Sequence, residues 1–276
     1  MILYSINGNT PKEAKMINFP DGTLKIDIEE KEIKSVLFIW KFKSEAEFMQ
    51  LAYMTGNIHD RYPAIDIQLY LPYLPNARMD RVHSETEVFT LKYFCKLINS
   101  LNFTKVMILD VHSSVGAALL ERCINLSPAP FISIARKTIG FDSENDYILF
   151  PDEGSCKRYT KYFSDCKNIG FGIKKRDWAT GKIFGFDIYG DAPTGKKVLI
   201  VDDICSYGGT VYHSAKKLKQ LNCDEINVFF THCENSIEMG ELFKCGLINN
   251  VFTTDSLCTL PDNNILFKID CLKGVV

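Results

Sequence analysis

The stretch that decides the fold is Lys197-Val-Leu-Ile-Val-Asp-Asp-Ile-Cys-Ser-Tyr-Gly-Gly-Thr210. Its apolar residues, 198–201, predict a buried parallel strand, and two aspartates follow them directly. A Gly-rich turn then opens a stretch with helical spacing, so its backbone N–H groups can meet a phosphate at the positive end of a helix. Two adjacent carboxylates suit the 2- and 3-hydroxyls of a ribose, with or without a bridging magnesium ion.

The predicted ribose-phosphate cradle has two parts, the acid pair for the sugar hydroxyls and the Gly-rich turn for the phosphate. Its residues are Asp202, Asp203, Ser206, Tyr207, Gly208, Gly209 and Thr210. The alternative is a strand that ends in an ordinary polar turn, because Asp-Asp and Gly-Gly pairs are common in loops. The order of strand, acid pair, glycines and helix favours the cradle.

Length and composition describe a globular protein. With 276 residues, 46% hydrophobic and 24% charged, the chain can form one large domain or two medium ones. A net charge of -2 and a pI near 6.2 favour small anionic ligands over nucleic acid or an anionic membrane. No secretion signal and no apolar run of ~18 residues is evident, so we expect a soluble, cytoplasmic protein with ten reduced cysteines.

Short apolar runs alternate with helical stretches along the chain, which predicts an α/β fold of mainly parallel sheets flanked by helices, with sites at the C-terminal ends of strands. The predicted strands are 35–40, 65–71, 105–109, 131–134, 147–150, 197–201, 226–231 and 250–253. The predicted helices are 45–55, 87–101, 114–125, 153–163, 210–221 and 237–245.

A weak internal repeat predicts two similar halves. Lys105-Val-Met-Ile-Leu-Asp-Val-His-Ser-Ser-Val-Gly116 matches 197–208 in its lysine, its apolar run, its first aspartate and its glycine. The alternative is that any two strand-to-helix turns look alike. A real repeat divides the chain into domains 1–130 and 131–276, with the boundary near Pro128-Ala-Pro130.

Polar residues follow two more predicted strands. Asp110 and His112 stand two apart after 105–109, so both can face a metal or a phosphate if the chain stays extended; a lone histidine there can equally be structural. Asp152 follows 147–150 in Phe150-Pro-Asp-Glu-Gly-Ser-Cys-Lys-Arg158, and helix capping alone can explain it.

Two segments are rich in cations. Pro72-Tyr-Leu-Pro-Asn-Ala-Arg-Met-Asp-Arg81 presents Arg78 and Arg81 for phosphate oxygens or a base, with a solvated loop as the alternative. Lys174-Lys-Arg-Asp-Trp-Ala-Thr-Gly-Lys182 has the composition of a mobile lid, although charge runs are usually solvated. The P-loop pattern Gly-x4-Gly-Lys-Ser/Thr does not occur, so no P-loop holds a nucleotide.

Six segments in chain order resemble the motifs of ribose-phosphate pyrophosphokinases, the PRPP synthetases. They are Asn18-Phe-Pro-Asp-Gly-Thr23, the 72–81 loop, 109–112, 150–158, the 174–182 stretch and the 197–210 loop. The last of these also resembles the PRPP-binding loop of type I phosphoribosyltransferases. A simple phosphoribosyltransferase would account for this loop but would leave the motifs of the N-terminal half unexplained. The resemblance implies two similar phosphoribosyltransferase-like domains, and covers nearly the whole chain.

The resemblance further implies a reaction in which the C1 hydroxyl of a ribose attacks the β-phosphorus of ATP, releasing AMP. Magnesium is then the cofactor and ATP the co-substrate, in a homo-oligomer with a shared ATP site. By resemblance, Phe19 and Asp21 reach the adenine bound at a neighbouring subunit. The other implied roles are ATP contact for Arg78 and Arg81, metal binding for His112, Asp152 and Asp110, and catalysis for Lys174 and Arg176.

Departures from the motifs concern substrate choice. Met79 and Thr23 stand where the family has a glutamine and an acid, and Ser155 replaces a glycine. Ser206 and Tyr207 replace the acidic and small residues common in the loop. Tyr207 suggests an acceptor that extends past the 5-phosphate, such as ADP-ribose, an activity of viral relatives; the alternative is that Tyr207 packs against the lid.

Two other functions stay open at this point. One is a type I phosphoribosyltransferase that joins PRPP to a base, and the other is an inactive regulatory subunit that oligomerises with an active partner. Retention of the acid pair, His112, Asp152, Lys174 and Arg176 argues against the inactive subunit.

Overall fold

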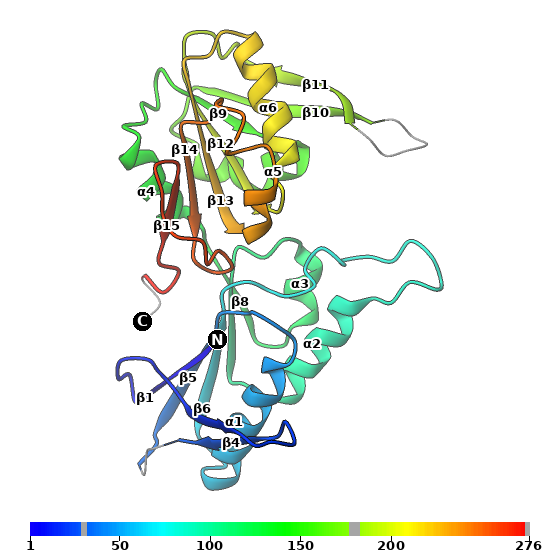
Figure 1. Ribbon diagram of the computed structural model, residues 1–276, viewed down its shortest axis with the longest axis vertical. Coiled ribbons are helices and arrows are strands. Elements are labelled where there is room, and N and C mark those ends of the chain that lie inside the picture. The colour runs from blue at the N-terminus through cyan, green and yellow to red at the C-terminus, as the bar shows by residue number, and fades with distance from the viewer. Residues whose placement is uncertain (29–31, 177–182, 274–276) are drawn as a thin grey trace. The chain divides into compact units, whose positions relative to one another are not determined.

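The computed structural model describes residues 1–28, 32–176 and 183–273, with only the backbone described at 174–176 and 183–185. These residues form two compact units (Figure 1). Unit 1 contains Met1–Ser127 together with the C-terminal residues 272 and 273, and unit 2 contains Pro128–Cys271. In the described part of the chain, no helix is long and apolar enough to span a membrane.

Unit 1 is built on a six-stranded sheet whose order is β2-β1-β5-β6-β7-β8. Strands β5 to β8 are parallel, while β1 is antiparallel to both β2 and β5. A separate antiparallel hairpin is formed by β3 and β4. The bounds are β1 Ile2–Ile6, β2 Lys12–Glu13, β3 Lys15–Asn18, β4 Leu24–Asp27, β5 Ser35–Trp40, β6 Asp66–Leu71, β7 Lys105–Leu109 and β8 Cys123–Leu126.

Helices α1 (Glu47–Arg61) and α2 (Thr90–Ser100) pack on the unit 1 sheet, and α3 (Ser114–Leu119) follows β7. In α1 the buried residues recur at helical spacing, and they share one core with β5 residues such as Phe38. Trp40 Nε1 donates a hydrogen bond to Glu47 Oε2 (2.8 Å), which ties the end of β5 to the start of α1. Figure 1 shows α1 and α2 on the same side of these strands.

Unit 2 is built on a seven-stranded sheet in the order β11-β10-β9-β12-β13-β14-β15. All neighbouring strands are parallel except the β10–β11 pair. The four apolar residues of β12, 198–201, are fully buried and β12 pairs in parallel with both neighbours, which confirms the predicted buried parallel strand. The bounds are β9 Tyr147–Phe150, β10 Asn168–Arg176, β11 Ile183–Gly190, β12 Lys197–Cys205, β13 Glu225–Cys233, β14 Asn250–Thr254 and β15 Leu266–Ile269.

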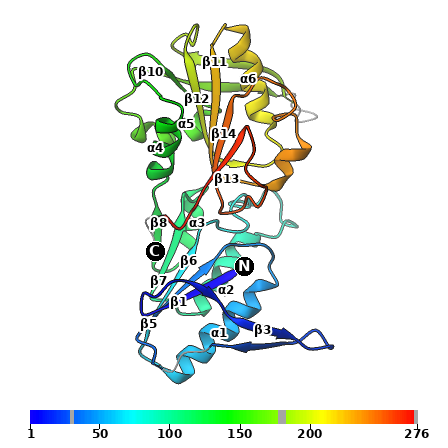
Figure 2. The ribbon, with the colours of Figure 1, turned by 60° about the vertical axis from the view of Figure 1, so that its left-hand side comes forward.

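Helices cover both faces of the unit 2 sheet. Figure 2 shows α4 (Ala129–Thr138) and α5 (Glu153–Tyr159) on one side of the sheet and α6 (Gly209–Gln220) on the other. The apolar face of α6 packs in one core with alternate residues of β12 and β13. Two short 3-10 helices, η1 (Thr160–Tyr162) and η2 (Asn235–Met239), complete the unit. The predicted α/β class with mainly parallel sheets and flanking helices is confirmed.

Three predicted elements are wrong in part. Residues 131–134 lie in α4 and not in a strand, because their burial follows helical spacing after a proline at the helix start. The helix predicted over 114–125 ends at Leu119, since Leu120 is extended and Arg122 has a positive φ of 54°, and β8 follows. The helix predicted over 237–245 is only the short η2.

Glycine packing in β10 gives a test of the sheet. A Cβ atom at Gly170 would lie 2.0 Å from the buried Tyr147 Oη and 2.8 Å from the Tyr189 carbonyl oxygen, so Gly170→Ala should lower the free energy of unfolding by about 2 kcal/mol. A Cβ atom at Gly56, inside α1, would meet no neighbouring group within 4 Å beyond its own helix. Gly56→Ala should therefore raise the free energy of unfolding by ~0.5–1 kcal/mol. Urea denaturation measures both; equal effects of the two changes would contradict this packing.

Candidate functional site

The acid pair lies inside β12, which runs on to Cys205, and not just after a strand as the sequence suggested. The Asp203 side chain is 4% exposed and that of Asp202 is 16% exposed. Arg158 of α5 contacts both: its Nη1 lies 2.7 Å from Asp203 Oδ2 and its Nη2 lies 3.7 Å from Asp202 Oδ1. No local sequence pattern indicates this role of Arg158, because the contact joins residues 45 positions apart in the chain.

Asp152 is the N-cap of α5, as the capping alternative proposed. Its Oδ1 accepts hydrogen bonds from the Ser155 N–H (3.0 Å) and the Ser155 hydroxyl (2.7 Å). Its charge also acts on Asp202, because both belong to the region where α5 packs on β12. We call Asp152, Asp202 and Asp203 the acid cluster.

The acid cluster holds more negative charge than its arginine balances. Burial raises the pKa of Asp202 well above its usual range, the charges of Asp203 and Asp152 raise it further, and Arg158 lowers it. Carboxylate oxygens are the ligands that magnesium prefers, and a bound divalent cation relieves this repulsion. The donor set of the acid cluster therefore fits magnesium.

The turn after β12 presents backbone donors. Gly208 has a φ of +75°, in the left-handed region that favours glycine, and it is the N-cap of α6. The first N–H groups of a helix have no partner within it, so the start of α6 can bind an anion. We call residues 206–210 the phosphate loop. In this loop Tyr207 is 57% exposed. The Ser206 hydroxyl donates a hydrogen bond to Glu234 Oε2 (2.6 Å), and Glu234 is a residue that the sequence motifs do not include.

In unit 1 the predicted arginine loop and histidine follow neighbouring parallel strands, β6 and β7. Asp80 links the two segments: Arg81 Nε lies 2.9 Å from Asp80 Oδ1, and Arg81 above all lowers the pKa of Asp80, with a smaller contribution from the charge of His112. The structure therefore brings Arg81 and His112 to one edge of the sheet. Asp80, to which the sequence motifs gave no role, interacts electrostatically with both of them.

The remaining residues predicted in unit 1 differ in exposure. Arg78 is exposed in the same loop. Asp110 is 7% exposed and has a positive φ of 48°, and its N–H donates to the Leu126 carbonyl oxygen (3.0 Å). Aspartate adopts the left-handed region more readily than most residues, because its short polar side chain can hydrogen-bond locally.

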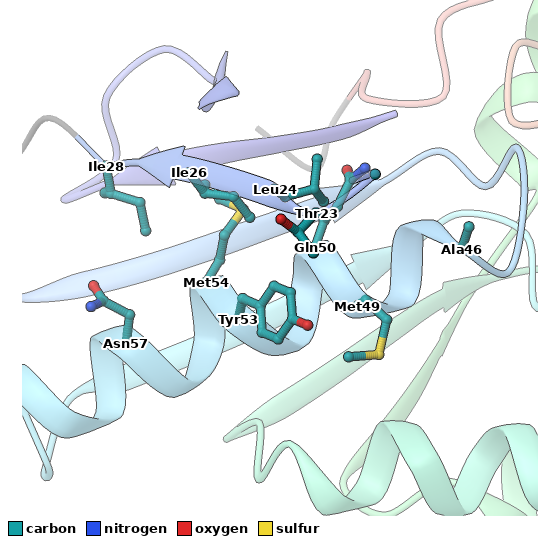
Figure 3. Close-up of a pocket in the computed structure, with 11 residues that line it drawn as sticks. Thr23, Leu24, Ile26, Ile28, Ala46, Met49, Gln50, Tyr53, Met54 and Asn57 are labelled. Atoms are coloured by element: carbon teal, nitrogen blue, oxygen red, sulfur yellow. The ribbon is translucent and has the colours of Figure 1, made fainter. Parts of the chain in front are cut away.

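Phe19 and Asp21 lie at the tip of the β3–β4 hairpin, where Phe19 is 48% exposed. Asp21 Oδ1 accepts hydrogen bonds from the Thr23 hydroxyl (2.7 Å) and N–H (2.9 Å), which fixes the turn. A groove of about 780 Å³ lies between this hairpin and α1 (Figure 3). Its lining includes the half-exposed side chains of Met49 and Tyr53, which extend from α1.

Lys174 and Arg176 lie at the end of β10, paired through the backbone with Phe186 and Ile183 of β11. The pairing register shifts between Lys175 and Arg176. The rest of the predicted lid, 177–182, lies outside the described residues.

No family model matches the chain. Individual relatives do match it, and those described below are ribose-phosphate pyrophosphokinases. A ribose-phosphate pyrophosphokinase of Pyrococcus furiosus is 26% identical over 243 residues, covering 84% of this chain and 85% of the relative. The ribose-phosphate pyrophosphokinase 2 of Enterococcus faecalis is 24% identical and covers 97% of this chain and 87% of its own length.

The fold matches a solved structure of the same kind. The phosphoribosylpyrophosphate synthetase of Mycobacterium smegmatis superposes with a TM-score of 0.75 at 16% identity, over 95% of this chain and 87% of that one. The phosphoribosyltransferase-like fold implied by the sequence motifs is thereby confirmed.

The two aspartates of β12 should affect stability in opposite directions. Asp202→Asn removes a carboxylate with a raised pKa and should raise the free energy of unfolding at pH 8 by about 1 kcal/mol. Asp203→Asn weakens the buried ion pair with Arg158 and should lower it by about 2 kcal/mol. Chemical denaturation of the two variants at pH 8 measures both changes.

The pH dependence provides the control. A raised pKa in the folded state means that the folded protein binds protons more tightly than the unfolded chain, so stability falls as pH rises above ~4 through that pKa. Asp202→Asn should flatten this fall. An unchanged slope in this variant would contradict the charge excess of the acid cluster.

Proposed function

Because this chain belongs to the ribose-phosphate pyrophosphokinase family, we propose that it transfers the β,γ-diphosphate of ATP to the C1 hydroxyl of a ribose 5-phosphate-type acceptor. The observation that carries the proposal is the order of the acid pair, Asp202 and Asp203 in β12, and the phosphate loop that leads into α6. Sugar hydroxyls need acceptors and a phosphate needs donors, and this strand and turn offer both in order.

Within the acceptor site, Asp202 and Asp203 accept hydrogen bonds from the ribose 2- and 3-hydroxyls. The backbone N–H groups of the phosphate loop and the start of α6 bind the 5-phosphate. We propose metal-ligand roles for Asp152 in unit 2 and for His112 in unit 1, where Asp110 supports His112. When bound, magnesium neutralises charge on the phosphates of ATP.

In the reaction, the C1 oxygen forms a bond to the β-phosphorus of ATP while the bond from that phosphorus to the α,β-bridging oxygen breaks. The C1 hydroxyl releases its proton to water, and AMP leaves with the bridging oxygen. Lys174 and Arg176 neutralise the charge that builds up on the transferring group, and no covalent enzyme intermediate is needed. Positioning and charge neutralisation supply most of the rate.

We further propose a homo-oligomer with a shared ATP site, in which Phe19 and Asp21 reach the adenine bound by a neighbouring copy. Arg78 and Arg81 contact the same nucleotide. The exposure of Phe19 at the hairpin tip, and of Met49 and Tyr53 along the groove beside it, supports association through this part of unit 1.

For the acceptor, we propose a ribose whose 5-phosphate carries a further group, as in ADP-ribose, beside ribose 5-phosphate itself. The support is Tyr207, whose ring is more than half exposed within the phosphate loop. An exposed ring beside a bound phosphate offers a stacking surface to a base or sugar that extends from it.

Incubation with ATP, magnesium and a panel of ribose phosphates tests the proposed reaction. We expect release of AMP and a mass gain of two phosphate units on ribose 5-phosphate, on ADP-ribose or on both, read by mass spectrometry. No turnover of ADP-ribose removes the extended acceptor. Base conversion that needs PRPP and no ATP would identify a phosphoribosyltransferase instead, and failure of both reactions favours a regulatory subunit.

Lys174→Ala and Arg176→Ala should each lower kcat by roughly 10³-fold, because each removes a cation from the transferring diphosphoryl group. Lys167→Ala is the matched control, since Lys167 is an exposed lysine that pairs with Glu144. Thermal unfolding should stay unchanged in all three variants. Near-normal kcat in Lys174→Ala and Arg176→Ala would contradict their catalytic role.

A further inference from the structure

The segment after β13 lies against the phosphate loop, although the reaction proposed above assigns it no role. We call residues 234–242 the support segment; it contains η2. The Glu234 N–H donates to the Cys205 carbonyl oxygen (2.8 Å), at the residue where β12 ends and the loop begins. Because β12 and β13 are parallel neighbours in register at Cys205 and Cys233, both segments leave the same edge of the sheet.

The support segment and the phosphate loop touch at two glycines. A Cβ atom at Gly240 would lie 1.9 Å from the Tyr207 carbonyl oxygen, so only glycine allows this close approach of the two backbones. A Cβ atom at Gly208 would lie 3.2 Å from the Leu242 side chain. The support segment therefore backs the end of β12 at Cys205 and the loop at 207 and 208.

The carboxylate of Glu234 completes this contact. Its Oε2 accepts a hydrogen bond from the Ser206 hydroxyl (2.6 Å) and lies 3.3 Å from the Ser236 hydroxyl. A carboxylate accepts and a hydroxyl has a single hydrogen to donate, so the Ser206 hydrogen is directed at Glu234 and not at a phosphate. Hydrogen bonds to a charged acceptor are stronger than neutral ones.

We propose that Glu234 is a positioning residue of the ribose-phosphate site. Its carboxylate fixes Ser206, and thereby holds the loop in the conformation that directs the N–H groups at the start of α6 toward a phosphate. The carboxylate reaches this point from the residue that directly follows β13, 28 residues along the chain from Ser206. The inference rests on the proposed function only in taking the 5-phosphate of the acceptor to bind this loop.

Loss of Glu234 should affect binding and not the chemical step, because the residue touches no reacting atom. A looser loop binds the acceptor more weakly in the ground state and the transition state alike, which raises KM and leaves kcat nearly unchanged. A residue with a purely structural role would instead lower the unfolding temperature without this split.

The test measures the affinity for ribose 5-phosphate by calorimetry, and KM and kcat in the presence of ATP and magnesium. Glu234→Ala should weaken binding about tenfold, which corresponds to the loss of one charged hydrogen bond. Glu234→Gln should weaken it less than threefold, because the amide oxygen still accepts from Ser206. Glu238→Ala, an exposed glutamate of the same segment, is the matched control and should change neither value.

Changes at Ser206 decide the mechanism. Ser206→Ala should reproduce the tenfold loss, and the Ser206→Ala/Glu234→Ala double variant should be no weaker than either single variant. Moving the carboxylate into the loop with Ser206→Asp/Glu234→Ala should restore binding to within threefold. Ser206→Ala answers the question even if Glu234→Ala does not fold.

Several outcomes overturn the inference. Unchanged binding by Ser206→Ala, additive losses in the double variant, or an equal loss in Glu238→Ala each contradict the role of Glu234. Absence of ribose 5-phosphate binding by the unaltered protein removes the site itself. Binding without ATP turnover contradicts the proposed reaction alone, because calorimetry reports on the loop independently of catalysis.

Discussion

The burial of two adjacent carboxylates in the last part of β12 is the constraint on which the rest of unit 2 depends. Charged groups taken out of water are costly unless a partner compensates them, and Arg158 provides that partner. The arginine reaches both aspartates because α5 packs on β12. The same helix begins at Asp152, which adds a third negative charge. One strand and one helix therefore make a site in which three carboxylates face one arginine.

The excess of negative charge in the acid cluster connects the stability of the fold with ligand binding. A carboxylate whose pKa is raised by burial and by like charges destabilises the folded protein when it ionises, and a cation or a hydroxyl donor at the same place relieves that cost. The phosphate loop has the opposite polarity, because free N–H groups at the start of α6 favour an anion. A ribose phosphate carries hydroxyl donors at one end and an anion at the other, and so matches both.

Local patterns in the sequence were sufficient for the elements and not for the contacts between them. The continuous apolar run of β12 and the glycines after it correctly predicted a buried strand, a turn and a helix. The equally short run 131–134 was misread, since a buried helix and a buried strand look alike over four residues. Arg158 and Glu234 reach the site from 45 and 28 residues away, and no local pattern reports such a contact.

The proposed roles divide between the two units in a way that bears on acceptor choice. The proposed acceptor residues, the acid pair and the phosphate loop, all belong to unit 2, whereas the proposed adenine and arginine contacts belong to unit 1. Within unit 2 the loop is backed by the segment that follows the neighbouring strand β13, with glycine at the point of closest approach. Under the proposed roles, the loop and its support segment contact the part of the acceptor beyond the sugar, while the acid pair contacts the sugar hydroxyls. The proposed acceptor choice therefore depends on Tyr207, which is exposed in the loop, and on the contact between Ser206 and Glu234.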